Sequence, residues 1–297
     1  MTDLIIETNQ LCKSFKDKQA LRGLDLSVPT GSIFGFLGRN GAGKTTTIKA
    51  LMGLLRSDSG TAEVFGIPIA DADRAISIRR RIGFVTEDKE LYPYMTVEQI
   101  IAFTRPFFPK WRTDLERRYL EMFELPPKAK IPSLSKGMRS KLMLLLAISR
   151  GADLLILDEP TDGLDPAAIE DVLRELVAIA ASSEVTMFFS SHQLAEVDLI
   201  ADHIGIIDHG KMIVAGALDD LKANYQRLHV VLSNSTPPPT HWPEGVESVH
   251  QDGRVISILA SHNIDAIAAE AQSIPGTTVE RFPVTLKEIF LEHARSN

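Results

Sequence analysis

The chain has 297 residues, of which 44% are hydrophobic and 24% charged, an ordinary composition for a globular protein of one or two domains. Its formal net charge of −7 disfavours nucleic acid as the main partner. A single cysteine, Cys12, excludes a disulfide framework and a cysteine metal cluster; the acidic start of the chain does not fit a signal peptide, and no apolar run reaches the length of about 18 residues that a membrane span needs.

Short apolar strands alternate with helical stretches over residues 1–225, which predicts an α/β domain. The strands are expected at 4–8, 24–28, 32–37, 81–86, 154–158, 185–190 and 203–208. The last three are nearly continuous apolar runs, which is typical of strands buried on both faces. Between about 95 and 150 the pattern changes to helix interrupted by prolines, which indicates a helical subdomain inserted into the sheet domain.

A phosphate-binding loop follows the strand expected at 32–37. Residues 38–46 read G-R-N-G-A-G-K-T-T and match G-x-x-x-x-G-K-[ST], a loop whose backbone N–H groups wrap the phosphates of a nucleotide. Lys44 is expected to reach the β- and γ-phosphates, and the Thr45 hydroxyl to ligate Mg²⁺. A helix over 46–52 would set the phosphates at its N-terminus. The sequence therefore predicts a nucleoside triphosphate site formed by Gly38, Arg39, Asn40, Gly41, Ala42, Gly43, Lys44, Thr45 and Thr46.

Two carboxylates follow the strand expected at 154–158. Asp158, at the carboxyl end of that strand, is placed to hold Mg²⁺ through water. Glu159 is placed to orient or deprotonate the attacking water. A core strand followed by two surface acids is the alternative.

Two further segments carry polar groups that suit a phosphate site. Ser135 and Gly137 precede a helix expected at 139–150, and a hydroxyl, an amide and a helix N-terminus together favour anion binding. A plain serine N-cap is the alternative. His192 stands just after the strand expected at 185–190, where a lone surface histidine would be the ordinary interpretation.

These segments, in this order, resemble the nucleotide-binding subunit of an ABC transporter. The resemblance rests on G-R-N-G-A-G-K-T-T, L-S-K-G-M, L-L-I-L-D-E-P-T-D-G-L-D-P and S-S-H, and it covers about residues 4–220. It implies an α/β P-loop NTPase fold, with a RecA-like core, an antiparallel β-subdomain and the inserted helical subdomain. It also implies an enzyme that hydrolyses ATP with Mg²⁺.

The resemblance further implies roles for single residues in the ATP site. Phe15 stands where the family places an aromatic side chain that stacks on adenine. Lys44 serves the phosphates, Asp158 ends the Walker B strand and Glu159 is the catalytic glutamate. His192 is the switch histidine that contacts the γ-phosphate.

The remaining matched residues are implied to act on the other subunit. Ser135 and Gly137 belong to the signature motif, which completes the ATP site of a second copy of the chain. Asp165 lies in the D-loop, which contacts the opposing site. The expected assembly is a head-to-tail homodimer that closes over two ATP molecules.

The chain departs from the family pattern at two positions. The signature is L-S-K-G-M where L-S-G-G-Q is commoner, so Lys136 adds a cation beside the retained serine and glycine. Glu87 occupies the position at which the family normally has a glutamine. A carboxylate ligates Mg²⁺ more strongly than an amide, and we expect a metal site of Thr45, Asp158 and Glu87.

The combination of L-S-K-G-M, the segment Phe108–Trp111 and a short C-terminal module resembles the ATPase subunits of exporter-type systems. This resemblance implies a separately encoded integral-membrane permease, which would hold the chain at the cytoplasmic face of the cell membrane. Residues 95–150 contain eleven Lys and Arg against five Asp and Glu, which would favour an anionic leaflet. Aromatic residues suited to a permease-docking surface gather there and just before it: Tyr92, Tyr94, Phe103, Phe107, Phe108 and Trp111. The alternative is that these aromatics form the core of the subdomain. Two other functions stay open: a soluble ABC ATPase that acts on ribosomes or DNA, and a slow module that signals by ATP-dependent dimerisation.

A second, small α+β module is expected over 226–297. The proline-rich loop Thr236–Thr240 indicates a boundary near its start, and the strand before that loop is counted as part of the module. Strands are expected at 229–232, 255–259 and 277–281, and helices at 264–273 and 286–294. Five of the eight histidines lie in this module, but their spacings fit no metal template. By analogy with similar tails, the module serves dimerisation or regulation.

Overall fold

A computed structural model describes residues 3–16, 18–88, 90–183, 185–233 and 241–295. It divides into two compact units, Met1–Ala215 and Gly216–Asn297. The helix α8 (Leu218–Asn224) thus belongs to the second unit, whereas the sequence placed the division after residue 225. The loop Thr236–Thr240, expected as the boundary, lies outside the described residues.

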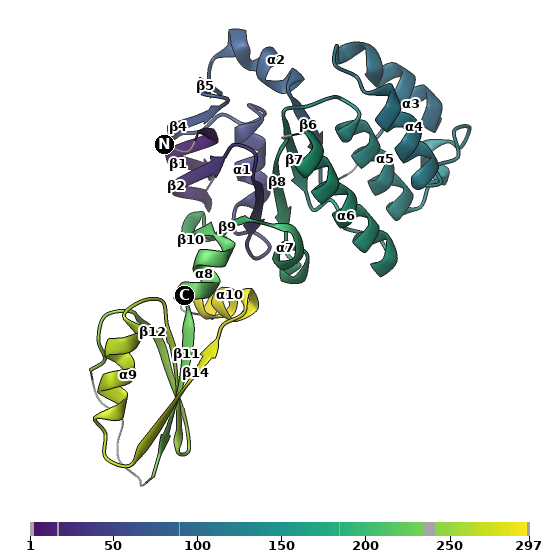
Figure 1. Cartoon of the computed structure of the whole chain (residues 1–297). Coiled ribbons are helices and arrows are strands. Elements are labelled where there is room, and N and C mark those ends of the chain that lie inside the picture. The colour runs from purple at the N-terminus through teal and green to yellow at the C-terminus, as the bar shows by residue number, and fades with distance from the viewer. Residues whose placement is uncertain (1–2, 17, 89, 184, 234–240, 296–297) are drawn as a thin grey trace. The chain divides into compact units, whose positions relative to one another are not determined.

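The first unit is built on a six-stranded sheet in the order β10-β9-β3-β8-β7-β6 (Figure 1). Its strands are β3 (Ile33–Leu37), β6 (Ile82–Val85), β7 (Leu154–Asp158), β8 (Thr186–Ser191), β9 (His203–Asp208) and β10 (Lys211–Ala217). All pairings among β3, β6, β7, β8 and β9 are parallel, so the carboxyl ends of these strands meet at one edge. Every residue of β3 and β7 is buried, as expected from their continuous apolar sequences.

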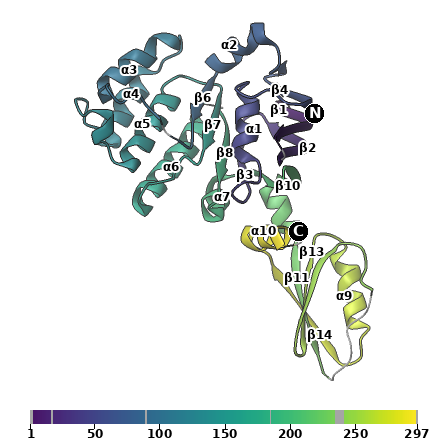
Figure 2. The same cartoon turned by 180° about the vertical axis from the view of Figure 1, so that it is seen from behind.

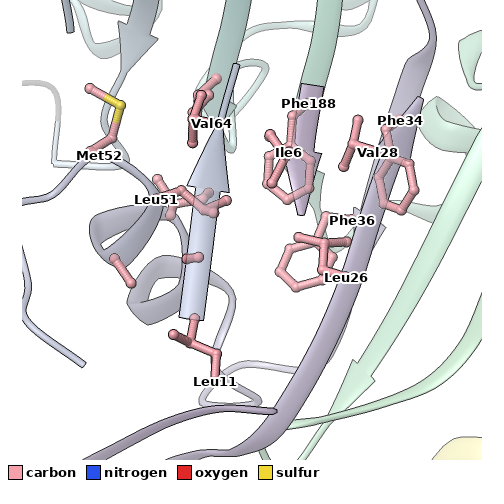
Figure 3. Packing of buried hydrophobic residues seen from close by; sticks show 14 of the residues in the cluster. Ile6, Leu11, Leu26, Val28, Phe34, Phe36, Leu51, Met52, Val64 and Phe188 are labelled. Carbon is pink, nitrogen blue, oxygen red and sulfur yellow. The ribbon is translucent and has the colours of Figure 1, made fainter. Parts of the chain in front are cut away.

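A second sheet in this unit is antiparallel, in the order β2-β1-β4-β5. Its strands are β1 (Leu4–Phe15), β2 (Lys18–Pro29), β4 (Ser59–Val64) and β5 (Ile67–Pro68). The helix α1 (Lys44–Leu51) packs with both sheets, and Figure 3 shows Leu51 in one cluster with Ile6 and Val64 of the antiparallel sheet and Phe188 of β8. Truncating a fully buried phenylalanine such as Phe188 costs about 3–5 kcal/mol, so this cluster fixes the two sheets around α1.

The inserted helical subdomain lies beside β6 and β7, on the side away from β1 and β2, as Figures 1 and 2 both show. It consists of α3 (Val97–Thr104), η1 (Arg105–Phe107), α4 (Thr113–Met122), η2 (Ile131–Ser133) and α5 (Lys136–Ile148). A capping box starts α3: the Thr96 hydroxyl accepts from the Gln99 N–H, and the Gln99 side chain accepts from the Thr96 N–H. The helix expected at 139–150 begins three residues earlier than expected, because the Ser135 hydroxyl caps it.

Three more helices complete the first unit. They are α2 (Ala72–Arg80), α6 (Pro166–Ser183) and α7 (Leu194–Ile200). The carboxylate of Asp71 caps α2 by accepting from the backbone N–H groups of Asp73 and Arg74. None of these three helices was expected from the sequence.

The second unit is a four-stranded antiparallel sheet, in the order β12-β13-β11-β14, with α9 on one face. Its elements are β11 (Gln226–Leu232), β12 (Val246–Asp252), β13 (Val255–Ala260), α9 (Ile264–Gln272), β14 (Thr277–Pro283) and α10 (Leu286–Arg295). Leu228, Ile258 and Ile267 lie at the centre of its core, each fully buried. The strand β12 was not expected, because its sequence V-E-S-V-H-Q-D is mostly polar and no residue of it is fully buried.

Candidate functional site

The phosphate-binding loop connects β3 to α1 at the carboxyl edge of the parallel sheet. Gly43 caps α1 with φ +120°, a conformation that side-chain-bearing residues rarely adopt, and a Cβ there would lie 2.9 Å from the Ala20 carbonyl oxygen. The Gly210 N–H donates to the Ala42 carbonyl at 2.8 Å and ties the loop to the turn after β9. The loop is therefore held between β2 and β9, with the first turn of α1 facing outward from the strand edge.

Lys44 is buried within this loop, with 7% of its surface exposed. Its ammonium donates to the Gly38 carbonyl at 2.7 Å and lies 3.6 Å from the Glu159 Oε1. The lysine is thus directed into the space between the loop and the end of β7, where phosphate oxygens would replace the backbone carbonyl as its acceptors.

Asp158 ends β7 beside β8, Glu159 follows it directly, and neither is a surface acid. Both are buried, with 2% and 7% of their surfaces exposed. The Ser190 hydroxyl donates to the Asp158 Oδ1 at 2.5 Å. Burial raises the pKa of Asp158, hydrogen bonds from the Ser190 and Thr45 hydroxyls oppose that shift, and the negative charges of Glu87 and Glu159 add to it. The alternative of two solvated acids after a core strand does not hold.

Glu159 has a left-handed backbone, with φ 49°, immediately after the strand. A residue with a side chain pays about 1–3 kcal/mol for such a conformation. The Glu159 N–H donates to the Ser190 carbonyl at 3.2 Å and to the Ser190 hydroxyl at 3.1 Å, and these bonds hold the strained residue in place.

His192 meets Glu159 across the strand edge. Its Nδ1 lies 2.8 Å from the Glu159 Oε2, and its backbone N–H lies 3.4 Å from the same oxygen. Because a carboxylate only accepts, Nδ1 is the donor in this contact, and the other ring nitrogen is directed away from Glu159. About half of the His192 side chain is exposed, so the ring can contact a ligand while it contacts the carboxylate.

Glu87, which follows β6, comes to the same place. Its Oε2 lies 3.4 Å from the Thr45 Oγ1. Three carboxylates, those of Glu87, Asp158 and Glu159, therefore surround the hydroxyl of Thr45 and the ammonium of Lys44. Oxygen donors of this kind suit a hard cation such as Mg²⁺.

Phe15, at the end of β1, lies at the mouth of the same cavity, with 48% of its surface exposed. Its neighbour Lys13 pairs with Asp58 at 2.8 Å, and the Asp58 carboxylate also accepts from the Ser14 N–H at 2.6 Å. These bonds fix the strand end that carries the ring. The cavity has a volume of about 440 Å³. It is lined by Phe15, Lys18, Ala20, Arg39, Asn40, Gly41, Gly43, Lys44, Thr45, Thr46, Glu87, Asp158 and Glu159.

Sequence reasoning did not identify Lys18, Ala20 or Ser190 as part of this site. Lys18 and Ala20 lie at the start of β2, which is paired with the strand end that bears Phe15. Nothing in the local sequence marks them, because they reach the cavity only through the β1–β2 pairing. Ser190 was available as the first residue of S-S-H, but its bond to Asp158 depends on the β7–β8 register.

Ser135, Gly137 and Asp165 do not line this cavity. They meet in a separate one, of about 440 Å³, where the start of α5 faces the start of α6. The Ser135 hydroxyl accepts from the Met138 N–H at 3.1 Å, so it is the N-cap of α5, and anion binding by this residue stays a prediction. Lys136 pairs with Asp162 at 2.7 Å and thereby joins the two segments.

An exposed aromatic surface lies on the segment before α3, on α3 and on η1. Tyr92, Tyr94, Phe103 and Phe107 are 44–69% exposed. The Tyr92 ring centroid lies 5.7 Å from that of Tyr94 and 5.6 Å from that of Phe103, and the Phe103 and Phe107 centroids are 5.5 Å apart. We call these four residues the aromatic surface. The other two aromatics of the expected cluster are half-buried: the Trp111 indole N–H donates to Glu116 at 2.6 Å, and the Phe108 ring packs under the Arg150 guanidinium.

The described residues contain no helix that is long and apolar enough to cross a membrane. Over the same residues, no three His, Cys, Asp or Glu side chains are grouped as a metal-binding cluster.

Comparison with known proteins was made at the level of families, sequences and structures. A family model described as ABC transporter matches residues 21–162, and one described as an AAA domain, putative AbiEii toxin, Type IV TA system, matches residues 127–198. The bacitracin transport ATP-binding protein BcrA of Bacillus licheniformis is 36% identical over 86% of either chain. The daunorubicin/doxorubicin resistance ATP-binding protein DrrA of Streptomyces peucetius is 37% identical over 86% of this chain and 80% of its own.

Solved structures give the same result. A structure of an ATP binding subunit of an ABC transporter aligns with a TM-score of 0.67 and 29% identity, over 74% of this chain and 92% of the other. A dimeric ATP-binding cassette in a post-hydrolysis state, bound to ADP and Pi, aligns with a TM-score of 0.65 over 72% of this chain and 98% of the other; at 22% identity it is a likeness of fold.

Proposed function

The chain belongs to the ABC transporter family as an ATP-binding subunit of the exporter type, and from that premise we propose how its residues share the work of ATP hydrolysis. The observation that carries the proposal is the separation of its motifs into two cavities. One holds the phosphate loop and the acids, and the other holds the signature residues and Asp165. Each cavity is then half of a site, and two copies in head-to-tail contact complete two ATP sites.

Within a site, Lys44 binds the β- and γ-phosphates and Phe15 stacks on the adenine. Glu159 is the base that activates water, and it is already polarised by Lys44 at 3.6 Å and oriented by His192 at 2.8 Å. His192 contacts the γ-phosphate with its other ring nitrogen, which donates a hydrogen bond to a phosphate oxygen while Nδ1 donates to Glu159, so both ring nitrogens carry a proton when both contacts are made. From the opposing copy, Ser135 and Gly137 bind the γ-phosphate from the far side.

The acids at the strand edge fit a Mg²⁺ ion. Asp158 is buried, its pKa is raised by burial and further by Glu87 and Glu159, and a cation among them would remove that repulsion. Thr45, Asp158 and Glu87 would hold the ion. Few protein ligands are needed, because phosphate oxygens and water supply the remaining ligands of a nucleotide-bound Mg²⁺. Bound Mg²⁺ supplies neutralisation of the phosphate charge.

The aromatic surface is the proposed docking site for the permease, because exposed aromatics are the side chains that contribute most at interfaces. The permease would hold the chain at the cytoplasmic face of the membrane. Electrostatic attraction to an anionic leaflet contributes less to membrane association than the number of Lys and Arg in 95–150 suggests. Five of the eleven basic residues of 95–150 are in ion pairs, three of them with acids outside the subdomain, namely Asp153, Asp162 and Glu175. The transport and resistance names of the relatives favour this function over an ATPase that acts on ribosomes or DNA.

Cross-linking tests the head-to-tail assembly. In a Cys12→Ser background, Asn40→Cys and Met138→Cys put one thiol at each cavity, and a short bis-maleimide should join two chains only when ATP and Mg²⁺ are present. The single-cysteine variants are the controls and should stay monomeric on a denaturing gel. If the double variant also gives no dimer under conditions in which ATP binds, the proposed assembly is wrong.

The docking site is tested separately, by co-expressing the chain with a permease encoded beside it. Tyr94→Ser with Phe107→Ser should abolish co-purification while the basal ATPase rate stays within twofold. Leu199→Ser, a change on the exposed side of α7 (66% exposed), is the control for a lost surface hydrophobe. Retained co-purification would move the docking site elsewhere.

A further inference from the structure

One buried carboxylate near the site belongs to none of the motifs described above. Glu196 lies in α7, four residues after His192, and only 5% of its surface is exposed. Its Oε2 accepts from the Thr161 hydroxyl at 2.8 Å and from the Ser191 hydroxyl at 2.9 Å. Its Oε1 is buried and has no hydrogen-bond partner among the described residues.

The two hydroxyl donors come from the two segments that carry the reacting groups. Thr161 follows Glu159 by two positions, and Ser191 immediately precedes His192. The Ser191 hydroxyl also accepts from the Gln193 N–H at 2.9 Å, which fixes the backbone on the far side of the histidine. Glu196 therefore joins the segment after β7 to the segment after β8.

This link lies beneath a second one between the same two segments. The outer link is the contact of the His192 ring with the Glu159 carboxylate at 2.8 Å, and half of the histidine is exposed there. The inner link, from Thr161 through Glu196 to Ser191, is buried on every member. An exposed ring can turn about its χ1 and χ2, whereas a buried carboxylate held by two hydroxyls is fixed.

Burying a carboxylate with one oxygen unpaired is unfavourable for the fold. Burial raises the pKa of Glu196, and the charge of Glu159 adds to that shift, while the Thr161 and Ser191 hydroxyls and His192 oppose it. Packing alone would be served as well by an apolar residue of the same shape. A buried acceptor for two hydroxyls, present here at such a cost, indicates a role in holding the Ser191–His192 segment.

We propose that Glu196 is a positioning residue, which keeps the Ser191–His192 backbone against Thr161 so that the His192 ring stays in register with Glu159. This inference rests on the roles of Glu159 and His192 given under the proposed function. Glu196 affects hydrolysis through His192 only. Glu196 does not line the cavity proposed for the nucleotide and the metal.

A double-mutant cycle on the full chain tests this dependence, with steady-state ATPase rates and ATP affinity measured for each variant. Glu196→Ala should lower kcat about tenfold, the low end of the loss when an outer orienting group is removed, with the Kd for ATP unchanged. Glu196→Gln keeps an acceptor for both hydroxyls and should restore most of the rate. In a His192→Ala background, Glu196→Ala should have no further effect on kcat.

The outcomes separate the two proposals. If Glu196→Ala lowers kcat by the same factor with and without His192, the residue acts through the fold at large, and the inference is overturned while the role of His192 stands. If His192→Ala itself leaves kcat unchanged, the role of His192 is wrong and the inference falls with it. Glu116→Gln, a change at a similarly buried carboxylate in the helical subdomain (8% exposed), is the matched control and should leave kcat unchanged.

Discussion

Replacing Glu159 by glutamine is the most direct perturbation of the proposed site. The change is nearly isosteric, so the 9% exposed side chain keeps its place and its Oε atom can still accept from His192. Glutamine cannot take a proton from water. Loss of a general base costs about 10²–10⁴-fold in rate, or roughly 3–5 kcal/mol of transition-state stabilisation.

The same change should tighten ATP binding. It removes one of three carboxylate charges around Lys44 and Thr45, and at a separation of roughly 5 Å and an effective dielectric constant of about 20, one such charge repels a phosphate charge by roughly 3 kcal/mol. That energy corresponds to an affinity gain on the order of a hundredfold. Slow hydrolysis and tight binding together should keep two chains in the closed, ATP-bound dimer.

Size-exclusion chromatography with light scattering measures whether the chain is a monomer or this dimer. With ATP and Mg²⁺, the Glu159→Gln chain should elute as a dimer that returns to monomer only when nucleotide is removed, while the wild type should elute mainly as monomer. Glu170→Gln is the matched control and should behave as wild type. Glu170 lies on the exposed face of α6, where its carboxylate pairs with Arg174 at 2.8 Å. Hydrolysis at the wild-type rate by the Glu159→Gln chain would refute the assignment of the base.

Three further changes probe other parts of the site. Phe15→Ala removes a stacking contact worth about 1–3 kcal/mol, so the KM for ATP should rise by about five- to a hundredfold with kcat little changed, and Phe15→Trp should restore it; an unchanged KM would exclude stacking. Glu87→Gln should raise the Mg²⁺ concentration for half-maximal hydrolysis several-fold, because an amide binds a hard cation more weakly than a carboxylate, and an identical Mg²⁺ dependence would take Glu87 out of the metal site. The pKa of Glu196 is raised in the fold, so its ionisation destabilises the protein as the pH rises from the unfolded-state pKa through the folded-state pKa. In denaturant unfolding of the nucleotide-free chain, the free energy of unfolding of Glu196→Gln should therefore exceed that of the wild type by more at pH 8 than at pH 4. A difference that does not change with pH would contradict the burial argument.

Much of the fold could be predicted where apolar runs end sharply. The strands β7 and β9 have the predicted bounds, because continuous apolar residues stop at Asp158 and Asp208. The strands β4 and β12 were missed for the opposite reason. In β4 only Ala62 and Val64 are buried, and β12 has no fully buried residue, so neither presents a hydrophobic pattern long enough to read.

The site was predictable as a set of residues but not as a network. The phosphate loop is a local feature of sequence, and all of its residues except Gly38 and Ala42 line one cavity together with Phe15 and the acids. The bond from Ser190 to Asp158 and the contact of His192 with Glu159 join positions more than thirty residues apart. They arise because β7 and β8 pair in parallel with Asp158 opposite Ser190, and a single sequence does not give that register.

The expected aromatic cluster shows the same limit. Phe107 and Trp111 are both aromatic residues near the end of α3, and composition cannot separate them. In the fold Trp111 is half-buried and donates to Glu116, whereas Phe107 is 58% exposed and contacts Phe103. The cluster is therefore divided in the fold: Trp111 is half-buried within the subdomain, whereas Phe107 is exposed, and docking to a permease stays a prediction for the exposed part.

The arrangement of charge explains why this site should couple ligand binding to stability. Asp158 and Glu196 are both buried with raised pKa values, and Glu87 and Glu159 lie close to Asp158. Such a group of acids opposes folding by mutual repulsion and lost hydration. In the proposed site, a Mg²⁺–nucleotide complex would bring a cation to the acids and phosphates to Lys44 and the helix N-terminus, and so would remove the repulsion in the folded state alone. Ligand at a hundred times its Kd should add about 2.7 kcal/mol to the free energy of unfolding. ATP binding would then stabilise the segments that carry the acids, as we expect of a subunit that closes on binding and opens on hydrolysis.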